Sequence, residues 1–581
     1  MLTTANKVIA FLGLMIPISI ANALSKEPLN VTAYYVKANE ATLAYHEADK
    51  ADIQVSAYSG NSIPDRRTFL IDPSKHAQPY LGVGSSFEEA SVYNFTILTS
   101  PEQRTAILKK LFSNAEQSFN WNLIRVTLGT SDFTPRVNNN PHYYTYDDND
   151  GNPDPNLDHF NLNIGLEPNK IGLIQQVFGI KTFQKSNLIL YASAWSPPAW
   201  MKKTDPNNKY ESTNKKIIDP ITQKIVDSKL IGGMLDTQYI DALAKYYLKT
   251  LLAYRSNGII FYAMSEMNEP CVGDFIYVNY PNTCILPDDA KALLLAMKTN
   301  FKNNQIDTKV WLNDFNFGNE SGIVNILDHD SEAAVAFDGI AYHSYYGRTD
   351  AMKAMLEKNY MSGNQPNSQG NTEYKGVYMS EFMTGWFWKG MELHNVPRIF
   401  DATRLLEYFH QGSSSYINWV TLRDERMGLI SGALIDENGK LGADSWYSPN
   451  SVFTKDGISY SYDFMDYALG AIAKFVTPGG NTDATKNAYV LADKDGYNQF
   501  YDTAFESSYT PTDFLQAKPE NLPKVSQLSF ENPDHSVVTV VVNAEDKPND
   551  IRIIFQGHNT QYQILATVPA QSVETFKWAT P

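Results

Sequence analysis

Residues 259–270 read Ile-Ile-Phe-Tyr-Ala-Met-Ser-Glu-Met-Asn-Glu-Pro, an apolar run that leads directly into two carboxylates. A short run of this composition is typical of a strand that is buried on both faces. Other runs of the same kind recur along the chain, and with this one they are Leu81–Gly84, Leu123–Leu128, Leu188–Ser193, Ile259–Met264, Lys309–Asn313, Gly339–His343, Gly376–Ser380 and Ser415–Val420. They predict eight strands of one parallel sheet.

Helix-patterned stretches separate several of these runs. In one of them Leu243, Ala244, Tyr247 and Leu248 place their side chains on a single stripe. The stretches are Pro101–Ser113, Asp236–Arg255, Pro287–Asn303, Ala351–Tyr360 and Pro397–Gln411, with a last one at Asp463–Phe475. Buried strands that alternate with amphipathic helices predict an α/β fold, a (β/α)8 TIM barrel.

The two ends of the chain have a different pattern. Residues 31–72 and 525–577 contain short alternating segments separated by Asn, Asp, Gly and Pro, which is typical of antiparallel strands. We therefore expect one discontinuous β-sandwich, built from both ends and appended to the barrel. The predicted boundaries are a signal peptide at 1–23, the first part of the sandwich at 24–76, the catalytic barrel at 77–476 and the second part of the sandwich at 477–581.

The first residues indicate export. Lys7 precedes an apolar run, and Ala21-Asn22-Ala23 has the small-x-small pattern of a signal-peptidase site. The apolar run is shorter than the roughly 20 residues that a spanning helix needs. We expect a secreted or otherwise exported protein, in an extracellular, periplasmic or lumenal space, with no transmembrane segment in the mature chain.

Composition narrows the possible partners. The 581 residues are 43% hydrophobic and 13% aromatic, and the formal net charge is -16. Such an acidic surface repels phosphate backbones, so nucleic acid is not an expected partner. The chain has two cysteines, Cys271 and Cys284, which are candidates for a disulfide bond in an exported protein, with two free thiols as the alternative. No phosphate-binding loop or metal-ligand motif stands out, so no cofactor and no metal are expected. The sequence does not determine the oligomeric state.

Two carboxylates follow predicted strands four and seven. They are Glu269, in the triplet Asn-Glu-Pro, and Glu381, directly after the seventh run. Active sites of such barrels lie at the carboxyl ends of the strands, and glycoside hydrolysis needs a pair of carboxyl groups on either side of the scissile bond. The pair therefore predicts a glycosidase. Glu266 is the local competitor of Glu269, and we interpret it either as a group that supports the catalytic residues without touching the substrate or as a structural ion-pair group.

Other polar and aromatic residues also follow the strands. Asp132 is either a turn residue or an acceptor for sugar hydroxyls, and His343 is either a strand-end histidine or part of the site. Trp195 and Trp419 are either core aromatics or walls that stack on a sugar face. The positions at the strand ends favour the functional interpretation.

The ordered motifs of this chain resemble glycoside hydrolase family 30, and most of all its glucosylceramidases (acid β-glucosidases). They are Leu81–Phe87, Ile124–Val126, Ser131–Phe133, Ala194–Lys202, Asn268–Pro270, Gly339–His343 and Ser380–Glu381. The resemblance implies a retaining β-glycosidase, with Glu269 as acid/base and Glu381 as nucleophile. It also implies that Asp132, Trp195, Asn268 and Trp419 bind the glucosyl unit, and that Arg125, His343 and Tyr345 support the carboxylates.

Departures from the family pattern concern the substrate. The strand-eight segment keeps Trp419 but not its usual neighbours, and residues 204–233 form a longer stretch than the family suggests. We expect glucosylceramide, held at a lipid or micelle surface, with β-1,6-glucan or another β-glycan as the alternative. Candidates for contact with lipid are Tyr210, Ile217, Ile218, Ile221, Phe387 and Trp388. A carbohydrate-binding protein without activity is the alternative from another class, but it has no need of both Glu269 and Glu381.

Overall fold

The computed structural model describes residues 29–580, apart from 62–65, 138–139, 142, 185, 206, 208–215, 219–224, 228–229, 275–279, 346, 362–373, 384–398, 425–433, 436–451, 454–461, 481–485, 493–522 and 558–559. The predicted signal peptide lies outside the described residues. Within the described part of the chain, no helix combines the length and apolarity that a membrane crossing requires.

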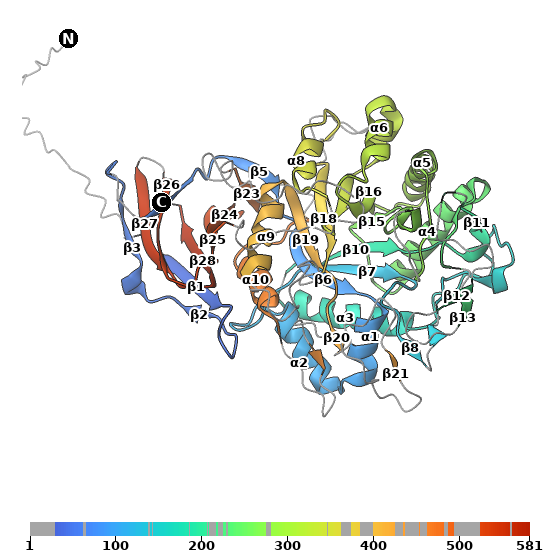
Figure 1. Ribbon diagram of the computed structural model, residues 1–581, viewed down its shortest axis with the longest axis horizontal. Helices are drawn as coiled ribbons and strands as arrows, with labels where there is room; N and C mark the ends of the chain where they lie inside the picture. Colours follow the sequence, from blue (N-terminus) through green and yellow to red (C-terminus); the bar gives the residue numbers. More distant parts are fainter. Residues whose placement is uncertain are drawn as a thin grey trace, which may run out of the picture.

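Eight parallel strands close into a barrel, which confirms the predicted fold (Figure 1). Around the barrel the order is β10-β15-β16-β17-β18-β19-β6-β7. The strands are β6 (Gly82–Phe87), β7 (Leu123–Leu128), β10 (Ile189–Ala194), β15 (Ala263–Ser265), β16 (Lys309–Asn316), β17 (Gly339–His343), β18 (Gly376–Phe382) and β19 (Ser413–Asn418). Gly84 is required where β6 pairs with β7, because a Cβ atom there would lie 1.7 Å from the carbonyl oxygen of Leu123.

Helices surround the barrel. They are α1 (Glu89–Tyr93), α2 (Pro101–Phe112), α3 (Glu167–Phe183), α4 (Ile240–Ser256), α5 (Pro287–Asn303), α6 (Ser321–His329), α7 (Ser331–Ala336), α8 (Asp350–Leu356), α9 (Ile399–His410) and α10 (Phe464–Ala473). The first turn of α2 is held by a capping box, in which Ser100 accepts from the Gln103 amide. Helices α1, α3, α6 and α7 are not among the predicted ones.

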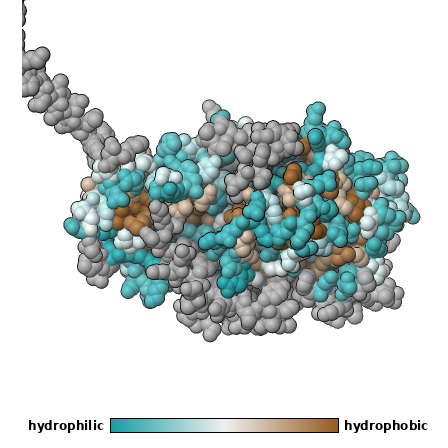
Figure 2. Space-filling view, turned by 90° about the horizontal axis from the view of Figure 1, so that it is seen from above, coloured by the Kyte–Doolittle hydropathy of each residue, from teal (hydrophilic) through white to brown (hydrophobic). Residues whose placement is uncertain are grey.

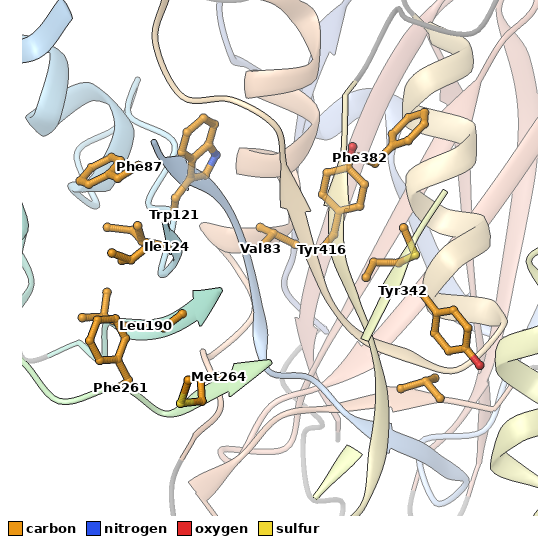
Figure 3. Close-up of a cluster of buried hydrophobic side chains, with 14 of the residues drawn as sticks. Val83, Phe87, Trp121, Ile124, Leu190, Phe261, Met264, Tyr342, Phe382 and Tyr416 are labelled. Carbon is orange, nitrogen blue, oxygen red and sulfur yellow. The ribbon is translucent and has the colours of Figure 1, made fainter. Parts of the chain in front are cut away.

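The barrel has a packed interior. Its inward layer includes Trp311 and Tyr378, whose rings stack with centroids 3.8 Å apart. Between the strands and the outer helices lies a larger core, of which Figure 3 shows one part around Val83, Ile124, Leu190 and Met264. On the face seen in Figure 2, hydrophilic residues dominate the described part, and hydrophobic ones gather in small groups.

The two ends of the chain form the predicted sandwich. One sheet has the order β2-β1-β28-β25-β24-β23-β5 and the other the order β3-β27-β26-β4. The strands are β1 (Val31–Lys37), β2 (His46–Glu47), β3 (Gln54–Ala57), β4 (Arg67–Ile71), β5 (His76–Pro79), β23 (Tyr489–Leu491), β24 (Val525–Glu531), β25 (Ser536–Asn543), β26 (Asn549–Gln556), β27 (Gln561–Val568) and β28 (Ser572–Ala579). In Figure 1 the first and last strands, blue and red, lie side by side, because β1 pairs with β28.

Short two-residue and three-residue strands complete the structure. They are β8 (Arg136–Val137), β9 (Asn140–Pro141), β11 (Lys202–Lys203), β12 (Lys216–Ile218), β13 (Ile225–Asp227), β14 (Met234–Leu235), β20 (Arg423–Asp424), β21 (Leu434–Ile435) and β22 (Val452–Phe453). They lie in connections rather than in the barrel wall. The predicted domain boundaries remain predictions; the one between residues 76 and 77 falls inside β5.

Candidate active site

Glu269 and Glu381 lie together at the carboxyl ends of strands four and seven. Glu381 belongs to β18, and Glu269 follows β15 by four residues. One carboxylate oxygen of each, with one nitrogen of His343, forms a group whose atoms are all within 4.8 Å of one another. Both residues are buried, with exposed fractions of 8% for Glu269 and 5% for Glu381. The structure thus brings the two predicted carboxylates together.

His343 lies between the two carboxylates. It ends β17, and its Nδ1 is 3.0 Å from Oε1 of Glu269 and 3.7 Å from Oε1 of Glu381. Burial alone would lower the pKa of His343, but the Glu381 charge and the hydrogen bonds with Asp314 and Glu269 outweigh it and raise the pKa to about 9. We therefore expect a charged imidazole at neutral pH.

Asp314 is a central residue of this site that the sequence analysis did not include among the candidates. Its oxygens accept hydrogen bonds from Ser193, Ser265 and Ser380 at 2.7–2.8 Å. It also lies 3.1 Å from Nε2 of His343. Although burial would raise the pKa of Asp314, Arg125 and His343 hold it well below its usual range. The only signal in the sequence is that Asp314 follows the fifth apolar run.

Arg125 connects the acidic groups. From the middle of β7 it donates to both oxygens of Asp314, at 3.2 and 3.1 Å, and to Oδ1 of Asn268. Its Nη2 lies 3.4 Å from Oε2 of Glu381. The guanidinium therefore holds Asn268 in place and places positive charge beside Glu381, as expected for a residue that supports the carboxylates.

Tyr345 contacts the predicted nucleophile directly. Its hydroxyl donates to Oε1 of Glu381 at 2.7 Å, and its amide donates to Asn316 at 2.7 Å. Burial raises the pKa of the Glu381 carboxyl; the charges of His343 and Arg125 oppose that rise, and the Glu269 charge adds to it. A donor on one oxygen and a cation near the other favour the ionised form that a nucleophile needs.

Trp195 and Trp419 form an aromatic wall beside Arg125. Their rings stack on one another with centroids 5.2 Å apart, and the guanidinium lies 5.1 Å from the Trp195 ring. Both are almost fully buried. One face of each ring is covered by the other ring. A sugar can therefore contact only the opposite face or the edge of each ring.

Asp132 lies near the carboxylates on the connection after β7. Desolvation and the charges of Glu381 and Glu269 raise its pKa well above the usual value. Among the described residues its Oδ1 has no hydrogen-bond partner. A hydroxyl group brought by a substrate would satisfy this oxygen, and the role of Asp132 as an acceptor for sugar hydroxyls stays a prediction.

Glu266 feels the charge of Asp314, but its hydrogen bonds go to other groups. Its Oε1 accepts the Asn313 amide at 2.9 Å, and Tyr247 donates to its backbone carbonyl. Burial raises the pKa of Glu266 to about 8, so the side chain is neutral at lower pH. These contacts support its interpretation as a structural group.

The structure joins Cys271 and Cys284 in a disulfide bond, two residues after Glu269. The lipid-contact candidates Tyr210, Ile221, Phe387 and Trp388 lie outside the described residues. Ile217 and Ile218 belong to β12, for which only the backbone pairing with β13 is described.

Together, the closed barrel and the carboxylate pair at strands four and seven define a barrel glycosidase. More narrowly, the chain belongs to glycosyl hydrolase family 30. The TIM-barrel domain of that family matches residues 80–369, and its β-sandwich domain matches residues 515–576.

Curated relatives include two kinds of enzyme. An endo-1,6-β-D-glucanase of Neurospora crassa is 28% identical over 53% of this chain and 58% of its own length. The lysosomal acid glucosylceramidase of Mus musculus is 26% identical over 53% of this chain and 54% of its own length. The chain thus aligns with little more than half of each. The solved structure of an endo-β-1,6-glucanase superposes with a TM-score of 0.66 at 19% identity, over 95% of this chain and 99% of the other, and supports the fold.

Proposed function

We propose that this chain is an exported retaining β-glucosidase that hydrolyses the β-glucosyl bond of glucosylceramide by double displacement. The observation that carries the reaction type is the short distance between the carboxylates, within 4.8 Å for one oxygen of each. Retaining glycosidases hold the two carboxyl groups about 5–5.5 Å apart, whereas inverting enzymes leave about 6.5–9.5 Å for a water molecule.

In the first step Glu381 attacks the anomeric carbon while Glu269 donates a proton to the leaving oxygen. The bond from carbon to the leaving oxygen breaks, and a glucosyl ester with Glu381 forms. In the second step Glu269 takes a proton from water, which attacks the same carbon and releases Glu381. Charged His343, 3.0 Å from Glu269, keeps that carboxyl group oriented between the steps.

A slow 2-fluoro glucoside tests this assignment. The peptide that contains Glu381 should gain the mass of one fluoroglucosyl group, and Glu381→Gln should abolish both labelling and turnover. A label on Glu269 or Glu266 would contradict the assignment. An unlabelled protein with no turnover of any β-glucoside would support the carbohydrate-binding alternative.

Two observations favour different leaving groups. The similarity to a lysosomal acid glucosylceramidase supports ceramide, and the similarity to an endo-1,6-β-D-glucanase supports β-1,6-glucan as a second candidate. Both substrates place a β-glucosyl unit beside Glu381, so the catalytic assignment is common to them.

Turnover of glucosylceramide in detergent micelles, of soluble β-1,6-glucan and of an aryl β-glucoside should be measured side by side. Ceramide release is the expected result. The Phe387→Ser, Trp388→Ser variant should lose ceramide release while it keeps most aryl glucoside turnover. Efficient cleavage of the glucan with no ceramide release in any detergent would assign the chain to the glucanases.

A further inference from the structure

Asp147, Asp154 and His159 form a cluster of metal-type ligands outside the active site. All three lie on the segment between β7 and α3, and one ligand atom of each is within 4.8 Å of the others. Two other groups in the described part of the chain meet the same distance. One is Cys271, Asp274 and Cys284, whose sulfurs are bonded to each other, and the other is the catalytic group Glu269, His343 and Glu381.

Asp147 is the member of the cluster that accepts no hydrogen bond from a neutral or basic donor. Its exposed fraction is 1%, and among the described residues the one side-chain hydrogen-bond contact of its carboxyl group is with the neighbouring acid Asp154. Buried carboxylates are normally hydrogen-bonded, paired with a cation or bound to a metal. A buried carboxylate whose side-chain hydrogen-bond neighbour is another acid therefore points to a ligand.

The other two residues shape the site and leave it accessible. Oδ2 of Asp154 is 2.8 Å from both Nδ1 and the backbone nitrogen of His159. The His159 side chain is 63% exposed, which provides an entry path. Lys249, whose charge also acts on Asp147, donates to the Leu157 carbonyl at 2.5 Å.

We propose that Asp147, Asp154 and His159 bind one divalent transition-metal ion of the zinc class. Imidazole nitrogen favours such ions over Ca²⁺ and Mg²⁺, which prefer all-oxygen sites. Two ligands that each lie about 2.1 Å from one ion are at most about 4.2 Å apart. The observed 4.8 Å limit therefore requires side-chain shifts of well under about 1 Å. The ion neutralises the buried carboxylates, and water completes its coordination.

The site connects the loop to the aromatic side of the active centre. Nε1 of Trp200 donates to the Asp147 carbonyl at 2.9 Å, and Trp200 lies five residues beyond Trp195. At the other end of the loop, Asn161 donates its amide to the Tyr146 carbonyl at 2.7 Å. An ion that ties Asp147 to Asp154 and His159 therefore stabilises the loop against the segment that carries Trp195.

The test is titration calorimetry with ZnCl₂ on the full, unreduced chain after chelator treatment and buffer exchange. The titration is done on the Glu381→Gln variant. The group Glu269, His343 and Glu381 also lies within the 4.8 Å limit, and this change removes one of its three possible ligands. We expect one Zn²⁺ per chain and a higher thermal midpoint on binding. Asp147→Asn and His159→Ala should each weaken binding at least about tenfold, since each removes one of three ligands.

Asp150→Asn is the matched control, because Asp150 is an exposed carboxylate of the same loop, and its binding constant should be unchanged. His159 is also exposed, so its replacement keeps the test valid if Asp147→Asn misfolds. The proposal is overturned if the parent chain shows no saturable Zn²⁺ binding. That result is expected if a proton shared between Asp147 and Asp154, rather than a metal ion, neutralises the two carboxylates. Affinity that is insensitive to His159→Ala, or Ca²⁺ binding without Zn²⁺ binding, overturns it as well.

Discussion

Asp314 organises the charges of the active site at the scale of single residues. Arg125 and His343 both contact it, and these two reach Glu381 and Glu269 in turn. The sequence was sufficient to predict that Glu269 and Glu381 lie together at the barrel mouth, because each follows an apolar run at a strand end. It was not sufficient to identify Asp314 as a central residue, because Asp314 is held by hydrogen bonds from serines on three other strands, which only the fold brings to it.

The same limit applies to Asp147, Asp154 and His159. Their spacing matches no metal-binding motif, and only the fold of the loop buries one carboxylate against the other. No metal was therefore expected from the sequence. Residue type and strand position predict which side chains meet at the mouth of a barrel, whereas clusters inside an irregular loop depend on the three-dimensional path of that loop.

Glu266 and Glu269 are two carboxylates three residues apart with different expected roles. Glu269→Gln should lower kcat about 10²–10⁴-fold for a poor leaving group, because it removes the proton donor. Glu266→Gln should change kcat less than about tenfold, because glutamine still accepts the Asn313 amide. Steady-state kinetics on one substrate, with circular dichroism as the folding control, compare the variants. Equal losses in the two variants would argue against Glu269 as the acid/base.

Glu266→Gln should also change how the stability of the chain depends on pH. The pKa of Glu266 is raised from 4.5 to about 8 in the folded chain, so the unfolded chain loses this proton at lower pH than the folded chain does. The wild-type protein therefore loses stability as pH rises from about 4.5 to about 8. Glutamine removes this loss. The Glu266→Gln variant should therefore be at least as stable as the wild type at pH 8, as measured by urea unfolding.

The ionisation of His343 also makes the stability of the folded chain depend on pH. Its pKa of about 9 in the folded chain exceeds its ordinary value of 6.5. The contribution of His343 is therefore complete below about pH 6.5 and is lost as pH rises through about 9, with a magnitude of about 3 kcal/mol. Urea unfolding from pH 6 to 10 should show this loss in the wild type and not in His343→Gln. Parallel slopes in the two proteins would contradict it.

At the scale of elements, the eight strands were predictable and several helices were not. Apolar runs reveal strands that are covered on both faces, and each predicted run overlaps a barrel strand. Helix α3 was not predicted because it buries charged residues. Its Lys170 forms ion pairs with Glu89 at 2.8 Å and with Glu167 at 3.0 Å. A stripe that contains a buried lysine does not show the expected apolar period.

Strand four shows a different limit. The predicted run Ile259–Met264 is longer than β15, which is Ala263–Ser265. Ile259 and Phe261 are buried in the core, although they precede the strand. Ile260, between them, is 68% exposed, so burial on both faces was predicted correctly only in part, and the assignment of the start of the run to an extended strand was wrong.

The disulfide bond supports the connection that follows β15. It closes a sequence separation of 13 residues next to Glu269, and a loop of that size contributes about 3 kcal/mol in the loop-entropy view. The unreduced protein should show no free thiol, and reduction should lower its thermal midpoint. Thiol titration and calorimetry measure these two effects.

The matched control for the disulfide is the double variant Cys271→Ser, Cys284→Ser. Its thermal midpoint should equal that of the reduced wild type and should not respond to reductant. Two titratable thiols in the native, unreduced enzyme would show that the bond is absent.

At the scale of the whole molecule, the barrel and the sandwich share one core. Val538, Val540 and Val542 of β25 belong to the core that continues into the barrel, whereas Val537 and Val541 belong to the core between the two sheets. This sheet is covered on both faces, which explains why the run from 537 to 542 is apolar without interruption, save for Thr539. In Figure 1, α9 and α10 lie between the sandwich and the barrel strands.

A shared core predicts that the two domains unfold together. Val540→Ala removes buried methyl groups at the surface between them and should cost about 2 kcal/mol. Because the barrel loses its support with the sandwich, calorimetry should show a single transition at a lower temperature, and aryl glucoside turnover should disappear at that same temperature. Val335→Ala, at a position 57% exposed, is the control and should leave both unchanged. Two resolved transitions, with activity following only the upper one, would show instead that the barrel is stable without the sandwich.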